Sequence, residues 1–133
     1  GFNPFVEKPI SFFEIKKDKH VLRMEKVRGR PDEPFVYFVS YFHPRIGLTG
    51  EEDFALPLYE MLESEHSTIA TLSKEEISAH AASADIAKKL RVQEGSPILF
   101  RKRFVFDQGQ RPMEFNLGYY KADSFVYTVE STR

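Results

Sequence analysis

The chain has 133 residues, a length that fits one domain rather than two. Hydrophobic residues make up 41% of it, enough for one sizeable core. Its 19 Lys and Arg residues are balanced by 20 Asp and Glu, which argues against a non-specific nucleic-acid binder because neutralising phosphates needs a basic surplus. The absence of cysteine excludes a disulfide framework and a cysteine nucleophile. No apolar run approaches the ~18 residues of a membrane span and no signal peptide is visible, so we expect a soluble, cytoplasmic protein.

The first part of the chain predicts strands. Residues 10–16 contain two phenylalanines and two isoleucines and suggest a strand, and residues 21–28 alternate between apolar and polar side chains. Residues 35–42 are rich in aromatic and β-branched side chains, which favour strands. A turn at residues 30–34 with two prolines joins the last two strands into a hairpin.

The middle predicts helices, with one ambiguity. Residues 57–63 predict a short helix that has Pro57 in its first turn and Leu58 and Leu62 four residues apart. Residues 68–72 predict a short strand. The run Ser-Lys-Glu-Glu at residues 73–76 fits a capping box, which would begin a helix there. In the competing interpretation residues 75–81 form a strand and the helix begins after Ser83 as its N-cap.

The last third predicts a long hairpin. Residues 98–106 and 113–120 are two strands joined by a turn at residues 107–110, and residues 125–129 predict a final strand. The sequence therefore predicts an α+β fold in which helices pack on an antiparallel sheet.

The two faces of residues 113–120 differ in chemistry, because residues two apart in a strand share a face. The odd positions are apolar or aromatic and predict core. The even positions are Glu114, Asn116, Gly118 and Tyr120, groups that could bind a small polar molecule by hydrogen bonds. The alternative is an ordinary solvent-exposed strand face.

Cations and a serine also share faces on other predicted strands. Lys26 and Arg28 point to one side and could hold a phosphate or carboxylate, or else belong to a solvated hairpin end. Ser40 is a lone hydroxyl on an apolar face, so it bonds either a ligand or nearby backbone. Arg101 and Arg103 form another same-face pair, which we interpret as mostly exposed.

Signals for metal or cofactor chemistry are missing from the sequence. The four histidines show no ligand-like spacing, and there is no glycine-rich phosphate loop or serine nucleophile elbow. We therefore expect no metal and no cofactor. Glu114 alone, as a general acid or base, is weak evidence for an enzyme.

Four motifs occur in a recognisable order. Lys26-Val27-Arg28 precedes a turn with Pro34 and a strand with Ser40, and residues 58–62 read Leu-Tyr-Glu-Met-Leu. Residues 79–92 carry Ala84, Ala87 and Leu90 ahead of Gly95-Ser96-Pro97, and Pro112-Met113-Glu114 leads to Tyr119-Tyr120-Lys121-Ala122-Asp123. In this order the motifs resemble the UTRA domain, the effector-binding domain of HutC-type regulators in the GntR family of transcriptional regulators. The resemblance covers about residues 10–133.

The resemblance implies a chorismate-lyase-like α+β fold for residues 1–133 as a single effector-binding domain. It implies a bacterial regulator whose N-terminal winged helix-turn-helix, outside these 133 residues, binds operator DNA. A small anionic metabolite, such as a sugar phosphate, an amino-acid derivative or an organic acid, would change DNA affinity. The matching positions are Lys26 and Arg28 for the anionic end, Ser40 beside them, and Glu114 and Tyr120 for the polar body. We further expect a homodimer in which residues 125–129 pair across a two-fold axis.

The sequence departs from the family pattern at two site positions. Lys26 stands where arginine is usual, and Phe38 stands where many members carry glutamate, which implies a less polar effector. Two alternatives to a sensor remain: a chorismate-lyase-like enzyme in which Arg28 and Glu114 hold and protonate the substrate, and a domain that only mediates assembly. Our leading expectation is a sensor domain without enzymatic activity.

Overall fold

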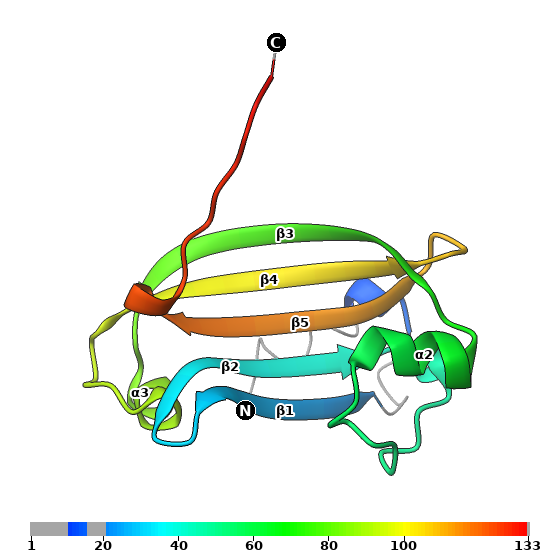
Figure 1. Cartoon of the computed structure of the whole chain (residues 1–133). Coiled ribbons are helices and arrows are strands. Elements are labelled where there is room, and N and C mark those ends of the chain that lie inside the picture. Colours follow the sequence, from blue (N-terminus) through cyan, green and yellow to red (C-terminus); the bar gives the residue numbers. More distant parts are fainter. Residues whose placement is uncertain (1–10, 16–20, 133) are drawn as a thin grey trace.

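One antiparallel sheet organises the computed structural model, which describes residues 11–15 and 21–132. Its strands are β1 (Leu22–Arg30), β2 (Glu33–Phe42), β3 (Ala70–Ala81), β4 (Pro97–Asp107) and β5 (Pro112–Lys121), arranged in the order β1-β2-β5-β4-β3 (Figure 1). The α-helices α2 (Leu58–His66) and α3 (Ala84–Leu90) lie near opposite ends of the sheet, and η1 (Pro44–Ile46) and η2 (Ala122–Ser124) are short 3-10 helices. This architecture confirms the predicted α+β fold.

The sheet consists of two hairpins, β1–β2 and β4–β5, and of a fifth strand, β3, that pairs with β4. β1 pairs with β2 and β4 with β5, as the sequence predicts, while β2 and β5 pair in the middle. The first hairpin requires Gly29, whose φ is +143° and whose absent Cβ would lie 2.6 Å from the Glu33 carbonyl oxygen. A register shift between Arg28 and Gly29 accompanies this close approach, as expected for a bulge beside a turn.

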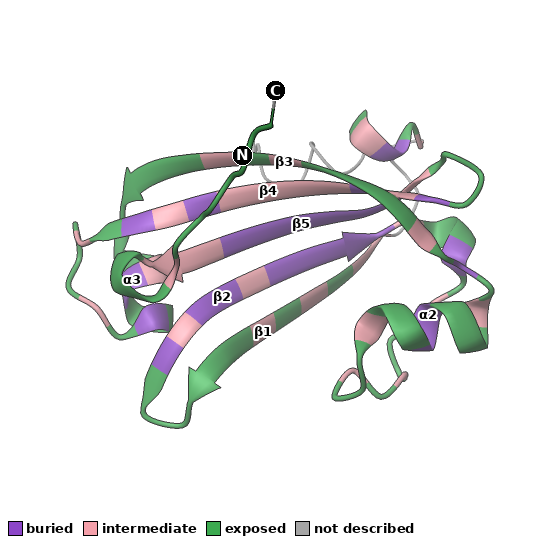
Figure 2. Ribbon diagram, turned by 45° about the horizontal axis from the view of Figure 1, so that its top comes forward, coloured by how far each residue is buried: buried purple, intermediate pink, exposed green. Residues whose placement is uncertain are grey.

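The main core covers one face of the sheet. It contains the odd positions of β5, namely Phe115 and Leu117 with Tyr119 partly buried, as alternation predicts. Leu90 of α3, with none of its surface exposed, and Phe13, at 2%, pack against this face. Burial is concentrated in the central strands β2 and β5, whereas β1 and β3 are largely exposed (Figure 2).

A second apolar cluster fixes α2 against the other face. Met61 and Leu62 of α2 are buried there with Phe42, Val105 and Met113. The helix begins at Leu58, one residue after the predicted start, with Pro57 as its N-cap, and extends three residues beyond the predicted end. The cluster lies beside the polar end of β5, so it places one helix next to the side chain of Glu114.

The structure resolves the ambiguity in the middle of the chain. β3 is a single strand of 12 residues that pairs with β4 along its length, so a helix beginning at Ser73 is wrong. α3 begins instead after Ser83, whose hydroxyl accepts a hydrogen bond from the Ile86 N–H at 3.3 Å. Pairing with β4 overrides the helix preference of the Lys-Glu-Glu run.

Two predicted strands are not strands. Residues 11–13 form a helical turn, with Phe12 packed edge-on against Phe104 at 5.1 Å between ring centroids, while residues 10 and 16 lie outside the described part. Residues 125–129 pair with no strand of the described chain and lead away from the sheet (Figure 1). There Val126 is 87% exposed, so its β-favouring side chain gains no burial that would fix it as a strand.

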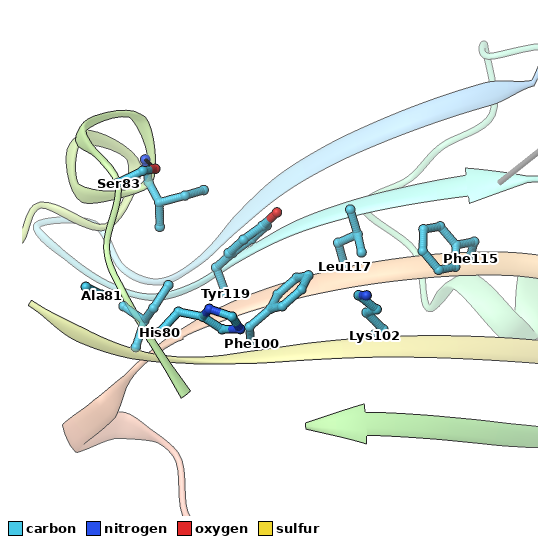
Figure 3. A pocket seen from close by; sticks show the side chains of 10 residues that line it. His80, Ala81, Ser83, Phe100, Lys102, Phe115, Leu117 and Tyr119 are labelled. Atoms are coloured by element: carbon cyan, nitrogen blue, oxygen red, sulfur yellow. Dashed lines mark hydrogen bonds between the residues drawn. The ribbon is translucent and has the colours of Figure 1, made fainter. Parts of the chain in front are cut away.

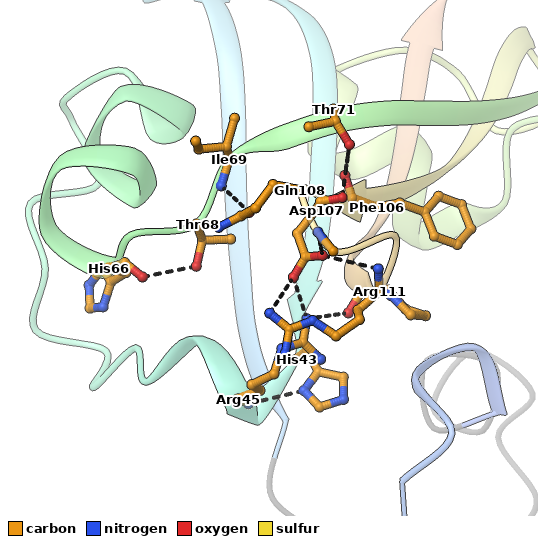
Figure 4. A network of polar contacts seen from close by, with 12 residues as sticks. His43, Arg45, His66, Thr68, Ile69, Thr71, Phe106, Asp107, Gln108 and Arg111 are labelled. Atoms are coloured by element: carbon orange, nitrogen blue, oxygen red, sulfur yellow. Dashed lines mark hydrogen bonds and ion pairs between the residues drawn. The ribbon is translucent and has the colours of Figure 1, made fainter.

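A buried carboxylate ties the β4–β5 turn to η1. Asp107 is 2% exposed and pairs with the guanidinium groups of Arg45 at 2.9 Å and Arg111 at 3.2 Å (Figure 4). Its Oδ1 also accepts from the backbone N–H groups of Gly109 and Arg111. The same turn holds the start of β3, because the Thr71 hydroxyl donates to the Asp107 carbonyl at 2.8 Å.

Candidate functional site

The face opposite the main core carries the polar side chains in rows across the strands. Strand register sets Met24, Ser40, Asn116, Arg103 and Glu75 side by side, one from each strand. The next row is Lys26, Phe38, Gly118, Arg101 and Ile77. Residues far apart in the chain thus meet on one surface because every pair of neighbouring strands is antiparallel and in register.

Glu114 is the centre of a hydrogen-bond network under α2. It is 2% exposed and accepts from the Tyr59 hydroxyl at 2.6 Å and from the Ser40 hydroxyl at 2.8 Å. The Asn116 amide in turn donates to the Ser40 oxygen at 2.6 Å. Ser40 is therefore satisfied by side chains rather than by nearby backbone. Burial raises the pKa of Glu114 even though these donors and two nearby arginines oppose the shift.

Two arginines of β4 face the same network. Arg103 contacts Glu75 of β3 through Nε at 2.8 Å and through Nη2 at 2.7 Å. The Arg101 side chain is 11% exposed and donates to the Asn116 amide oxygen at 3.3 Å. Its Nε is buried and has no acceptor among the described residues, so this guanidinium has hydrogen-bonding capacity that the protein does not use.

Two aromatic rings contact Arg101, which lies opposite Gly118 in the neighbouring strand. The Arg101 guanidinium carbon lies 5.3 Å from the centre of the Tyr120 ring and 6.0 Å from that of Phe38. A Cβ on Gly118 would lie 2.9 Å from the Tyr120 ring and 3.4 Å from that of Phe38. The missing side chain at position 118 therefore lets the two rings converge beside the arginine.

The first hairpin supplies two more cations at the rim. The Lys26 ammonium donates to the carbonyl of Phe54, and burial together with the nearby charge of Arg28 lowers the pKa of Lys26. Arg28 is exposed. Both residues line the same cavity, as their spacing predicts.

A cavity of about 160 Å³ opens among these residues. Its described lining includes four of the five predicted site residues, Lys26, Arg28, Ser40 and Glu114. Tyr120, the fifth, is not part of the lining and contacts the site through Phe38 and Arg101. The five predicted residues therefore lie close together: four line the cavity, and Tyr120 packs behind residues that line it.

Sequence reasoning missed part of this lining. Arg101 and Arg103, interpreted as mostly exposed, have largely buried side chains that line the cavity, so that interpretation is wrong. The hairpin contained the signal, because a turn at residues 107–110 places Arg101 and Arg103 on the same face as Glu114 and Asn116. A register shift between Val105 and Phe106 then sets Arg103 opposite Asn116 and Arg101 opposite Gly118. Tyr59 had no such signal, since its place depends on how α2 packs across the sheet.

A larger cavity of about 320 Å³ lies on the core face, between α3 and the sheet (Figure 3). Ile86, Ile98, Phe100 and Leu117 give it a mainly hydrocarbon lining, with polar groups of His80, Ser83 and Lys102 beside them. Ligand sites combine apolar walls with converging polar groups. Polar and charged side chains converge in the smaller cavity of about 160 Å³, which is therefore our candidate site.

The described residues hold no group of three histidine, aspartate or glutamate side chains arranged to bind a metal ion. In the same part of the chain no helix has the length and apolarity needed to span a membrane.

Comparisons with known proteins agree with one another. The family model described as "UTRA domain" matches residues 7–126. The chain is 25% identical over 116 residues to the HTH-type transcriptional regulator GgaR of Escherichia coli K12, covering 87% of this chain and 46% of GgaR. It is 27% identical over 106 residues to the HTH-type transcriptional repressor NagR of Bacillus subtilis, covering 79% of this chain and 44% of NagR. The chain therefore spans about half the length of these curated relatives.

A solved structure supports the fold. The effector domain of PhnF from Mycobacterium smegmatis superimposes with a TM-score of 0.85 over 96% of this chain and 79% of that chain, at 19% identity.

Proposed function

This chain belongs to the UTRA domain family, and we propose that it is the small-molecule-sensing domain of a bacterial GntR/HutC-type transcriptional regulator. In this proposal an anionic metabolite binds the β-sheet cavity and changes the operator affinity of a DNA-binding domain outside these 133 residues. The helix-turn-helix names of GgaR and NagR, together with their greater length, support such an arrangement.

The charge of the cavity supports an anionic effector. Among the residues that the structure describes, four cationic side chains line it, namely Lys26, Arg28, Arg101 and Arg103. Of the nearby carboxylates, Glu75 is shared by Arg103 at 2.7 Å and Arg101 at 3.9 Å, and burial favours the neutral form of Glu114. The surplus positive charge is best compensated by a phosphate or carboxylate, for which arginine offers paired N–H donors.

Coupling to DNA requires that the effector bind one arrangement of the regulator better than another. A coupling of about 1–3 kcal/mol would change operator affinity by roughly 5–150-fold. Tyr59 and Ser40 donate to Glu114 from two elements, so a ligand that competes for these groups would alter how α2 meets the sheet.

A thermal-shift screen of phosphorylated sugars, amino acids and aromatic acids tests the anion site. A true effector raises the melting temperature because it binds the native state. Arg28→Met and Arg101→Met should each weaken its apparent affinity by about 10–100-fold, the value of a lost charged hydrogen bond. Lys88→Met, an exposed cation on α3, is the matched control. Equal shifts in all four proteins would mean that the ligand binds elsewhere.

No observation favours the lyase alternative. Both carboxylate oxygens of Glu114 already accept hydrogen bonds, from Tyr59 and Ser40, so this network accounts for the buried carboxyl without a catalytic role. The named relatives are transcriptional regulators, so we propose a domain without catalytic activity. Conversion of chorismate to 4-hydroxybenzoate by the purified chain would reverse this proposal.

The C-terminal segment supports a homodimer. Val126, Tyr127 and Val129 are 87%, 57% and 66% exposed, and such residues favour strands. β3 is an edge strand of the sheet, so a second copy offers unpaired backbone to this segment. Sedimentation should give a dimer for the wild type and a monomer for the double variant Val126→Asp, Val129→Asp. A wild-type monomer at high concentration would contradict the dimer.

A further inference from the structure

A further cavity, distinct from the one on the core face, lies beside the candidate site on the polar face of the sheet and is called the second compartment. It measures about 240 Å³ and is lined by Tyr59, Ala70, Thr71, Leu72, Ser73, Arg103 and Val105. Tyr59 and Arg103 line both cavities, so these two side chains form the wall between them. Neither cavity reaches the ~300 Å³ at which small-ligand pockets usually begin, whereas the two together exceed it.

The two sides of this wall are held differently. Arg103 is fixed by two contacts with Glu75, at 2.8 Å and 2.7 Å. Tyr59 is 38% exposed, and its hydroxyl reaches the site through the hydrogen bond to Glu114 at 2.6 Å. The Tyr59 hydroxyl also interacts with Arg103. A ligand hydroxyl that donates to Glu114 in its place would remove the hydrogen bond to the carboxyl and loosen the partly exposed ring.

The two compartments differ in charge. The first holds four cations, whereas Arg103 is the only charged residue in the described lining of the second. Ala70, Leu72 and Val105 give the second compartment aliphatic surface. Of the Thr71 and Ser73 hydroxyls in its lining, that of Thr71 already donates to the Asp107 carbonyl, and that of Ser73 lies on an exposed strand position. This compartment therefore suits an uncharged, largely aliphatic group.

We propose that the two cavities form one binding groove for an elongated amphipathic anion, with Tyr59 as the residue that sets how long a ligand is accepted. The acidic end lies among Lys26, Arg28 and Arg101, and the uncharged chain passes Tyr59 to reach Val105. This inference rests on the proposed sensor function and narrows its ligand class to an acid or phosphate monoester that carries a chain of several carbons.

Titration calorimetry with methyl, butyl and hexyl phosphate tests the groove. In the wild type, affinity should rise by about two- to fourfold per added methylene, as expected for apolar surface leaving water. Ser73→Phe fills the second compartment from an exposed strand position, so it should abolish this rise and leave methyl phosphate binding unchanged. Ser78→Phe, on the opposite face of β3, is the matched control and should behave as the wild type.

Tyr59→Phe gives an independent readout, because it removes the hydroxyl that holds the wall closed. It should strengthen hexyl phosphate binding several-fold more than methyl phosphate binding. Equal affinity for all three phosphates in the wild type, or a chain-length effect that survives Ser73→Phe, would overturn the groove while leaving the anion site intact. Binding of none of the three would overturn the anion site, and the groove with it.

Discussion

Replacing Asp107 with alanine should lower the free energy of unfolding by about 1–3 kcal/mol, the usual cost of leaving the hydrogen-bonding partners of a buried group unsatisfied. The change leaves Arg45 and Arg111 without their counter-charge and two backbone N–H groups without an acceptor (Figure 4). Urea denaturation at neutral pH measures the loss.

Two further variants isolate the cause. Asp107→Asn keeps an oxygen for the N–H groups of Gly109 and Arg111 but removes the charge. It should therefore lower the free energy of unfolding clearly less than Asp107→Ala does. Asp123→Ala changes an exposed aspartate of η2 and should leave stability within about 0.5 kcal/mol of the wild type. A loss as small for Asp107→Ala as for Asp123→Ala would show that the turn is not held by this carboxylate.

Acid should act on the same residue. Burial alone would raise the pKa of Asp107, but the N–H groups of Arg111 and Gly109 and the two guanidinium groups hold it below its ordinary value. A carboxylate with a lowered folded pKa contributes stability that is present above its unfolded pKa and is lost as pH falls through the folded value. The wild type should therefore lose part of its advantage over Asp107→Asn in acid.

Glu114 should give the opposite pH dependence. Burial raises its pKa in the folded state. Below the ordinary value of 4.5 the carboxyl is protonated in both the folded and the unfolded chain, so it does not lower the free energy of unfolding there. As pH rises from 4.5 toward the raised folded pKa, the unfolded chain gives up its proton first. Stability then falls by about 1.4 kcal/mol for each pH unit and levels off above the folded pKa.

Glu114→Gln removes this ionisation and should flatten that part of the stability curve. The informative quantity is the difference in unfolding free energy between wild type and variant, measured by urea denaturation from pH 4 to pH 8, because other titrating groups cancel in it. Glu76→Gln, an exposed glutamate on the opposite face of β3, should run parallel to the wild type. Parallel curves for Glu114→Gln as well would mean that this carboxyl ionises as freely in the folded protein as in solution.

Local patterns predicted the elements whose partners are close in the chain. Both hairpins follow from alternation and turn residues, and the split of β5 into an apolar and a polar face follows from the same period of two. Ser83 can act as the N-cap of α3 whether the strand before it is long or short. In each case the residues that decide the structure lie within a few positions of one another.

Long-range packing decided what the sequence could not. The run at residues 73–76 favours a helix by itself and becomes a strand because β4 pairs with it. Phe12 and Phe13 favour a strand by their residue type, yet they lie in a helical turn whose packing depends on aromatic rings of strands far along the chain. Tyr59 meets Glu114 across 55 residues, so no local pattern could place it in the site.

The order of the strands has a consequence for how the domain assembles. Each hairpin joins segments that are neighbours in the chain and can close early, whereas the junction between β2 and β5 brings together Ser40 and Glu114, which are 74 residues apart. Closing so long a loop is the slow and entropically costly step of such a topology. The candidate site straddles this junction, so it forms only once β2 and β5 have paired. A metabolite bound as proposed would hold the two halves of the sheet together.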